Sequence, residues 1–176
     1  ADRGSNVILR YDFLTTYIHI IIGDGTATTT GSTDPLAAKI GLPQALSFAR
    51  SGALVIGLNY GAAFITLDES LCPTPAADAK GPAYTLAGSA TSGALADGTG
   101  SAAVFSTPTA VAPHAAEADA AYVADSANHA VRKLTGGAVV TTLASSANGG
   151  LDSPGGLCVS SDGSSVFVAD TNHHRI

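Results

Sequence analysis

One short pattern occurs three times in the chain and constrains the fold more than any other feature. Residues 166–176 have the sequence VFVADTNHHRI, residues 121–131 have AYVADSANHAV, and residues 1–8 have ADRGSNVI. The two longer copies combine a short apolar strand, an Ala-Asp pair, a small polar turn and the start of a further strand. Such self-similarity is the signature of a repeat architecture, so we expect one structural unit to be used several times.

The spacing of the pattern gives the size of that unit. Asp125 and Asp170 stand 45 residues apart in their copies. The pattern apolar-x-x-Pro also recurs, at 40–43, 105–108 and 151–154. A four-stranded propeller blade takes roughly 40–50 residues, which agrees with this period. The first two prolines stand further apart because residues 68–82, with three prolines and no periodicity, form a predicted surface insert.

Short runs of β-branched and aromatic residues predict strands throughout the chain. Only 12% of the residues are charged and 20 are glycines, which suits short strands joined by tight turns. We expect one helical turn at 36–40 and a loop at 89–100, whose Gly-rich part at 93–100 should be a flexible connection between strands. The predicted strands are 6–12, 16–22, 45–48, 53–58, 62–67, 82–88, 110–112, 122–124, 130–134, 139–143, 157–159 and a last one beginning at 166.

Together these motifs resemble the NHL repeat. The hallmark of that family is a strand, Val-Ala-Asp, a small turn and Asn-His-Arg-Ile, and residues 154–159 and 162–176 (PGGLCV and DGSSVFVADTNHHRI) match it well. The similarity is also strong at 121–134 and good at 1–12. It is weaker at 57–64, where Gly57-Leu58-Asn59-Tyr60 stands in place of the Ala-Asp turn.

The resemblance implies an all-β chain, a β-propeller of the NHL type. Family members usually form six-bladed rings, and this chain would supply a partial ring of about three to four four-stranded antiparallel blades. We expect a single propeller segment over 1–176, divided into a blade part at 1–25, blades at 43–88 and 108–144, and a blade part at 154–176.

The blade count predicts open ends. We interpret the chain as a piece of something longer, because it begins late in one blade and stops as the third strand of another begins. Residues 6–12 and 166–176 should therefore lie in different sheets. Further sequence or a neighbouring subunit should cover their open sides, since two bare blade faces expose more apolar surface than a soluble monomer tolerates.

The residues of the repeat signature invite a chemical interpretation, but we predict structural roles for them. Each aspartate can accept backbone N–H groups within its turn. His129 and His174 share one repeat position, so they should stack between strands or pair with the Asp of a neighbouring repeat. We therefore expect no catalytic, cofactor-binding or metal-binding residue and no cofactor. The signature residues are Asp2, Asp125, Asn128, His129, Asp170, His174 and Arg175.

Two cysteines and one threonine are candidates for covalent chemistry. Cys72 and Cys158 lie too far apart for a zinc or redox motif, which leaves one buried thiol and one loop thiol, or a disulfide between neighbouring blades. Thr74 lies between two prolines and is a candidate for O-glycosylation.

The net charge and the length of the apolar stretch limit the classes of function that the chain can have. The net charge of −6 argues against nucleic acid, and the apolar stretch 13–22 is far too short to span a bilayer. We expect a non-catalytic protein-interaction or structural module that presents its loops to other proteins or to further copies of itself. An extracellular or surface location is favoured, with the cytoplasm as the alternative. A lyase or hydrolase centred on the channel, and a carbohydrate-binding module, remain alternative functions.

Overall fold

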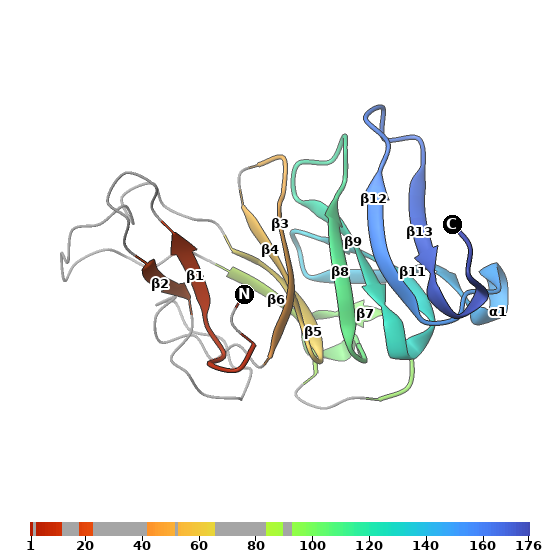
Figure 1. Cartoon of the computed structure of the whole chain (residues 1–176), viewed down its shortest axis with the longest axis horizontal. Coiled ribbons are helices and arrows are strands. Elements are labelled where there is room, and N and C mark those ends of the chain that lie inside the picture. The colour runs from red at the N-terminus through yellow and green to blue at the C-terminus, as the bar shows by residue number, and fades with distance from the viewer. Residues whose placement is uncertain (2, 12–17, 23–41, 52, 66–83, 90–92) are drawn as a thin grey trace.

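The chain is a row of antiparallel sheets arranged along an arc (Figure 1). The structure, a computed structural model, describes residues 1, 3–11, 18–22, 42–51, 53–65, 84–89 and 93–176. Within these ranges strands dominate and no helix exceeds four residues. The predicted helical turn at 36–40 and the insert at 68–82 lie outside them.

Four sheets follow one another in chain order. The N-terminal sheet pairs β1 (Ile8–Tyr11) with β2 (Ile18–Ile22), and the C-terminal sheet pairs β12 (Pro154–Val159) with β13 (Val166–Asp170). The strands predicted at 6–12 and from 166 onward thus lie in different sheets. The second sheet contains β3 (Pro43–Phe48), β4 (Leu54–Leu58), β5 (Gly61–Ile65) and β6 (Tyr84–Gly88). The third contains β8 (Pro108–Pro113), β9 (Ala120–Asp125), β10 (Ala130–Thr135), β11 (Val139–Ser145) and the short β7 (Gly98–Thr99).

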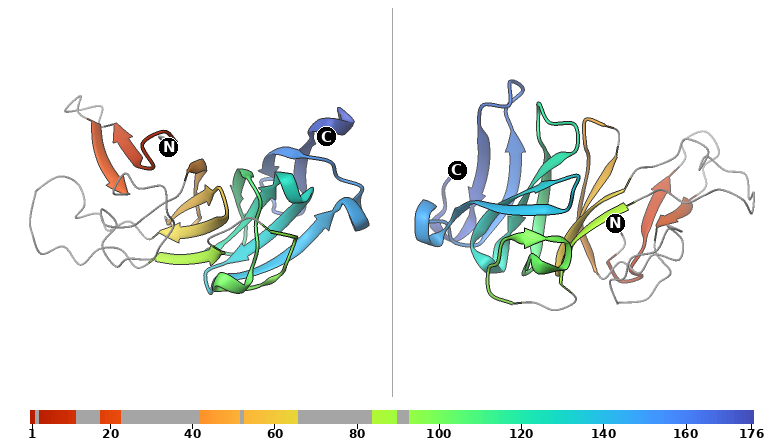
Figure 2. Two further views of the ribbon diagram at one scale, coloured as in Figure 1. Left: turned by 90° about the horizontal axis from the view of Figure 1, so that it is seen from below. Right: turned by 180° about the vertical axis from the view of Figure 1, so that it is seen from behind.

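The first strands of three sheets, β3, β8 and β12, lie side by side (Figure 1). Each sheet then continues outward in sequence order, β3-β4-β5-β6 and β8-β9-β10-β11. This radial stacking of four-stranded meanders is the architecture of a β-propeller, and it confirms the predicted fold class. Seen from below, the row bends into a crescent with a two-stranded sheet at each end (Figure 2).

The hydrophobic core lies between sheets rather than within one. Val55 of the second sheet and Val111, Val123 and Leu134 of the third are buried together around Phe105. A Cβ atom added at Gly57 would lie 3.3 Å from Val111 Cγ1, so the two sheets approach closely there. A sheet cannot bury both of its own faces, and its neighbour supplies the missing contact.

The third sheet has one strand that the sequence did not predict. β7 pairs with the outer strand β11, with Thr99 opposite Val139, inside the segment expected to be a flexible loop. A strand of two residues is too short to show the alternation of apolar and polar side chains by which strands are predicted. Gly98 passes so close to Ala102 that an added Cβ would lie 2.9 Å from its methyl group, so a larger residue would strain this strand. Short helices η2 (Gly100–Ala102), η3 (Ser126–Asn128), α1 (Ser146–Gly149) and η4 (Thr171–His173) complete the described fold.

The strand register defines equivalent positions in three sheets. The prolines that open β3, β8 and β12 pair with Leu58, Asp125 and Asp170, respectively. Counting from these pairs places Val55, Tyr122 and Phe167 at one repeat position, opposite Ser47, Ala112 and Cys158.

Candidate functional site

Asp125 anchors the turn between β9 and β10. Its Oδ1 accepts the N–H of Ser106 at 2.7 Å, and its Oδ2 accepts the side-chain amide of Asn128 at 2.9 Å. Arg132 of β10 donates to the same Oδ2 at 3.0 Å. The carboxylate is buried, and three groups from three segments bind it, so it joins the start of its blade to the turn and to the third strand.

Asp170 repeats this arrangement in the C-terminal sheet. Its Oδ1 accepts the N–H of Asp152 at 2.7 Å. This hydrogen bond is equivalent to the one that Ser106 donates to Asp125. His173, at the repeat position of Asn128, lies with Nδ1 2.9 Å from Oδ2. Arg175 donates Nε–H to Oδ2 at 2.8 Å and also reaches the carbonyl of Gly150.

The residue that ends each turn links one sheet to the next. Asn6 and His129 both have left-handed backbone conformations, with φ of 53° and 50°. Asn6 Oδ1 accepts the N–H of Leu42 at 3.0 Å, and His129 Nδ1 accepts that of Ser153 at 3.1 Å. In both cases the donor immediately precedes the proline that opens the next sheet. His129 Nδ1 also lies 2.9 Å from Asp152 Oδ1, so the tautomer that carries its proton on Nδ1 would donate to that carboxylate instead.

A buried arginine is the centre of the third sheet. The Arg132 side chain is fully buried, lies over the Phe105 ring at 5.0 Å and donates to Asp125. It also binds Asp97 Oδ1 at 2.9 Å and the carbonyls of Ala96 and Val104, so it fastens residues 96–104 to the blade. Among the residues that the structure describes, its Nε has no hydrogen-bond partner. Arg132 is not among the residues predicted from the sequence, although strand alternation from the buried Ala130 to Leu134 points its side chain inward.

The three carboxylates titrate differently. Burial raises the pKa of Asp125, although Asn128, Ser106 and Arg132 oppose that effect. The N–H of Asp152, together with His173 and Arg175, lowers the pKa of Asp170 to about 2 against the effect of burial. For Asp97, partial burial raises the pKa, but the bonds from Thr142 and Arg132 outweigh it and leave a lowered pKa.

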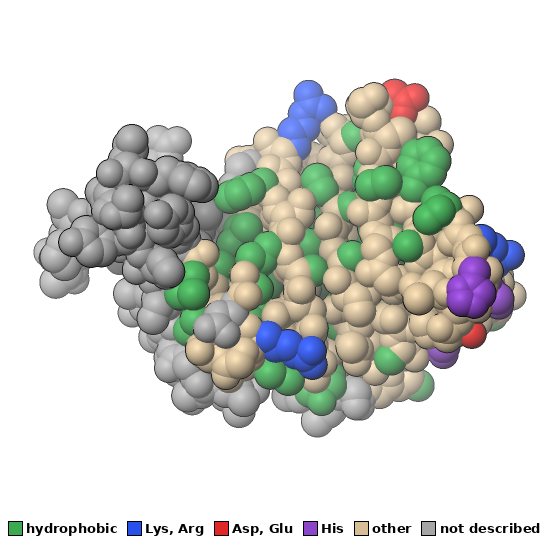
Figure 3. Space-filling model, viewed as in Figure 1, with side chains coloured by type: hydrophobic (Ala, Val, Ile, Leu, Met, Phe, Trp, Pro, Cys, Tyr) green, Lys and Arg blue, Asp and Glu red, His purple; other side chains and the backbone are tan. Residues whose placement is uncertain are grey.

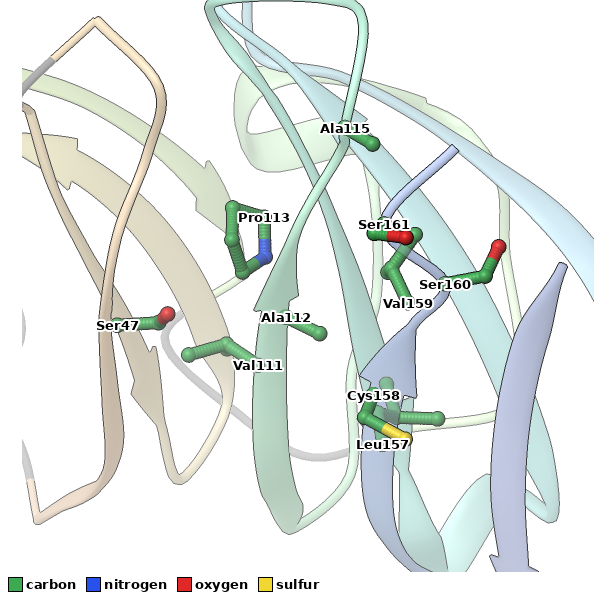
Figure 4. Close-up of a pocket in the computed structure, with 10 residues that line it drawn as sticks. All are labelled: Ser47, Val111, Ala112, Pro113, Ala115, Leu157, Cys158, Val159, Ser160 and Ser161. Carbon is green, nitrogen blue, oxygen red and sulfur yellow. The ribbon is translucent and has the colours of Figure 1, made fainter. Parts of the chain in front are cut away.

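An open groove of about 340 Å³ lies between β8 and β12, at the end where the β8–β9 and β12–β13 loops project (Figure 4). Its lining is made of small apolar and hydroxyl side chains, and the surrounding face carries few charges (Figure 3). The residues are Ser47, Val111, Ala112, Pro113, Ala115, Leu157, Cys158, Val159, Ser160 and Ser161.

The rim of the groove is braced by its own hydrogen bonds. His114 Nδ1 accepts the N–H groups of Ala116 and Glu117, and its ring stacks on Tyr122 at 5.4 Å. Arg50 of the neighbouring β3–β4 loop donates to the carbonyl of Ala115 at 2.6 Å. These bonds hold the β8–β9 loop in one position without using a charged group inside the groove.

The remaining predicted residues are scattered. Cys158 is a free thiol, is exposed on β12 and lines the groove, whereas His174 is exposed after η4. Cys72, Thr74 and Asp2 lie outside the described residues. Within the part of the chain that the structure describes, no three His, Cys, Asp or Glu side chains are grouped to hold a metal ion, and no helix is long and apolar enough to cross a membrane.

Solved structures with this arrangement are propellers. Two auxiliary nutrient-binding proteins, from Bacteroides thetaiotaomicron and Bacteroides ovatus, each match 99% of this chain with a TM-score of 0.69 and 17% identity. A Bacteroides thetaiotaomicron protein of unknown function matches 94% of it with a TM-score of 0.57 and 17% identity. This chain spans only 42%, 43% and 40% of those proteins, and such low identity establishes the fold alone. The class is therefore a partial β-propeller.

The family model of the NHL repeat matches residues 151–176. The match covers β12, β13 and the Asp170 turn, where the resemblance in the sequence is also strong. The chain thus contains an NHL repeat at residues 151–176. No curated protein sequence matches it.

Proposed function

We propose that this propeller module binds partner proteins without catalysing a reaction. The observation that carries the proposal is the groove between β8 and β12, whose loops are braced in fixed positions and whose lining is small and uncharged. Rigid strands that hold loops in place are a common basis for recognition by shape. The proposal includes a location outside the cell or at its surface.

The signature carboxylates support a binding role rather than turnover. Asp125 and Asp170 each accept bonds from three groups of their own chain, and those bonds fix the turns. A general acid or base must lie within hydrogen-bond distance of a substrate proton, whereas the Asp125 and Asp170 carboxylates are hydrogen-bonded to groups of their own chain. A lyase or hydrolase of the channel would need other residues.

A small carbohydrate is the second candidate ligand. The groove volume falls within the range of ligand pockets, roughly 300–1,000 Å³, and Ser47 and Ser161 offer hydroxyl groups. Two proteins of similar fold are described as auxiliary nutrient-binding proteins. Their similarity extends to the fold, so the ligand class comes to this chain only as a proposal.

Cys158 makes occupancy of the groove measurable. In a Cys72→Ser chain, Cys158 is the remaining thiol, and its rate of maleimide labelling should fall when a ligand fills the groove. Proteins captured from the source organism and a set of hexaoses (malto-, cello- and xylohexaose) would be compared as protecting agents. Protection by a protein supports the first proposal, and protection by a sugar alone supports the second.

Matched variants test whether binding uses the groove. Ser161→Trp would fill it, whereas Thr141→Trp places the same side chain on the exposed outer strand β11. Captured proteins should be lost with the first variant and retained with the second. If both variants capture the same proteins, the groove is not the binding site.

A further inference from the structure

Two strand edges border the groove, and no described strand pairs with either of them. β8 and β12 each open their sheet and are bonded on one side, β8 to β9 and β12 to β13. Among the described strands β3 is likewise paired only with β4. The free side of these first strands, here called the inner edge, is therefore a shared property of three successive sheets.

The register of β12 decides which of its backbone groups point to the inner edge. In an antiparallel ladder, residues that exchange hydrogen bonds with the partner strand alternate with residues whose N–H and C=O groups point away from it. The Ser160 N–H binds the Ser165 carbonyl at 2.9 Å, so Cys158, two residues earlier, also bonds towards β13. The N–H and C=O groups of Leu157 and Val159 therefore point to the inner edge.

β8 presents the same edge with one donor fewer. Val111 and Pro113 stand three and five residues after the proline that opens β8, as Leu157 and Val159 do in β12. The His114 N–H binds the carbonyl of the first residue of β9 at 2.8 Å, so both β8 residues point inward by the same count. All four residues line the groove (Figure 4). Proline has no N–H, which makes β12, with two donors and two acceptors, the better template for a further strand.

The charges above the groove favour a cationic group at one end of its ligand. Asp162 lies in the β12–β13 loop, where hydrogen bonds from Ser160 and Ser164 lower its pKa to about 2, so it is ionised at neutral pH. Its partners among the described residues are hydroxyl and amide groups, with no cation. By contrast, Glu117 in the neighbouring β8–β9 loop is already paired with Lys133.

We propose that the ligand of the groove is an extended peptide segment of a partner protein, which adds to the inner edge of β12 as a further strand. The proposal rests on the proposed function, because it names the part of a partner protein that the groove receives. The main chain of the segment exchanges hydrogen bonds with Leu157 and Val159, and a lysine or arginine at one end lies beside Asp162. Every second side chain faces the third sheet, where Ala112 and Pro113 line the groove. Strand addition of this kind obtains affinity from the main chain and specificity from alternate side chains.

Val159→Pro removes one of the proposed hydrogen bonds and leaves the ladder of the sheet intact. The Val159 N–H is not used between β12 and β13, and proline is tolerated in an edge strand at such a position. β8 already contains Pro113 at the equivalent place. Val159→Ala is the matched control, because it shortens the side chain and keeps the N–H. Thermal unfolding checks that both variants fold.

Peptides selected from a displayed library of short random segments are the probe. Those that slow the maleimide labelling of Cys158 in the Cys72→Ser chain are synthesised, and their affinities are measured by fluorescence anisotropy. Val159→Pro should weaken binding by about tenfold or more, and Val159→Ala by less than about threefold. N-methylation of the peptide should weaken binding to the unsubstituted chain at alternate residues and have little effect at the residues between them.

Asp162→Asn tests the end of the segment. Asparagine keeps a side-chain acceptor for the loop and removes the charge, so a peptide that ends in lysine should bind about threefold or more weakly at low salt. Asp119→Asn removes an exposed charge from the β8–β9 loop and should have a smaller effect. Equal effects of the two substitutions would show that Asp162 does not contact the segment.

The possible failures separate this proposal from the proposed function. Equal losses in Val159→Pro and Val159→Ala, together with no alternation in the N-methylated peptides, overturn strand addition. The groove would remain a protein-binding site in that case if Ser161→Trp still abolishes binding. If captured proteins protect Cys158 and no peptide does, a folded surface is the ligand and strand addition is wrong. If only the hexaoses protect Cys158, the protein-binding function fails as well.

Discussion

The turns at Asp125 and Asp170 share a sequence pattern but differ in their electrostatics. Both aspartates accept a backbone N–H from the segment that opens their sheet, at the same 2.7 Å distance. Asp125 also faces the buried Arg132, and burial raises its pKa, whereas Asp170 faces the exposed Arg175 and His173 and its pKa falls to about 2. The difference arises from what surrounds each turn, because of these two sheets only the third contains a described third strand.

A repeat motif therefore specifies a turn but not the chemistry of its carboxylate. Arg132 comes from the strand that follows the Asp125 turn, and it also binds Asp97 and lies over the Phe105 ring. In the C-terminal sheet the cation is Arg175, which pairs with Asp170 as Ala130 pairs with Asp125 and so stands directly after the turn. Substitutions of equivalent residues in the two turns should thus have unequal effects.

The largest effect is expected for Asp125→Asn. This substitution can place an amide N–H group opposite the Asn128 and Arg132 donors that Oδ2 now accepts, and a buried donor that loses its acceptor costs about 1–3 kcal/mol. Urea unfolding should show the loss. Combining Asp125→Asn with Arg132→Met removes both charges, so the double variant should lose less stability than the sum of the two single variants; strict additivity would show that the pair is not coupled.

Asp170→Asn should cost less stability than Asp125→Asn under the same conditions. The partners that it leaves behind, Arg175 and His173, are exposed and can be solvated by water. The comparison of urea midpoints at pH 7 checks the order of the two effects. An equal loss in both variants would mean that the surroundings of the turns do not matter.

The sequence predicted the strands, the repeat and the propeller because these depend on local patterns. Apolar alternation marks each strand, and the Ala-Asp turn marks each repeat. The contacts of the site depend instead on register between sheets. Arg132 and Lys133 are adjacent cations, and only the strand alternation decides that the first is buried. The bond from Ser153 to His129 joins residues in different sheets, and β7 is too short to leave a pattern.

Acid titration should distinguish the two turns, because the Asp125 and Asp170 carboxylates change the stability of the fold with pH in opposite directions. The folded pKa of Asp170 is depressed from 3.8 to about 2, so its contribution to stability is present above pH 3.8 and is lost as the pH falls towards 2. Asp125 has a raised folded pKa, so its contribution is present below pH 3.8 and is lost as the pH rises through that folded pKa. Urea midpoints between pH 2 and 6 should therefore fall less steeply on acidification in Asp170→Asn than in the unsubstituted chain. A steeper fall would contradict the assigned sign.

The smallest change in stability is expected for His129→Asn, because asparagine already occupies the equivalent position in the first copy of the repeat. Asn6 occupies the position of His129 in the first copy, with the same left-handed backbone, and its side-chain oxygen accepts the equivalent N–H of the next sheet. His129→Asn should thus keep both the conformation and the bond to Ser153 and change the free energy of unfolding by less than about 0.5 kcal/mol.

His129→Val is the matched contrast. Valine has no acceptor for the Ser153 N–H, and a β-branched side chain is strained at a φ of 50°, by roughly 1–2 kcal/mol. Thermal unfolding of the two variants, measured side by side, would show whether the acceptor and the backbone conformation are what this position supplies. If asparagine and valine destabilise the chain equally, the imidazole ring has a role at the boundary between the third and C-terminal sheets that Asn6 does not share, and its contact with Asp152 becomes the first place to look for it.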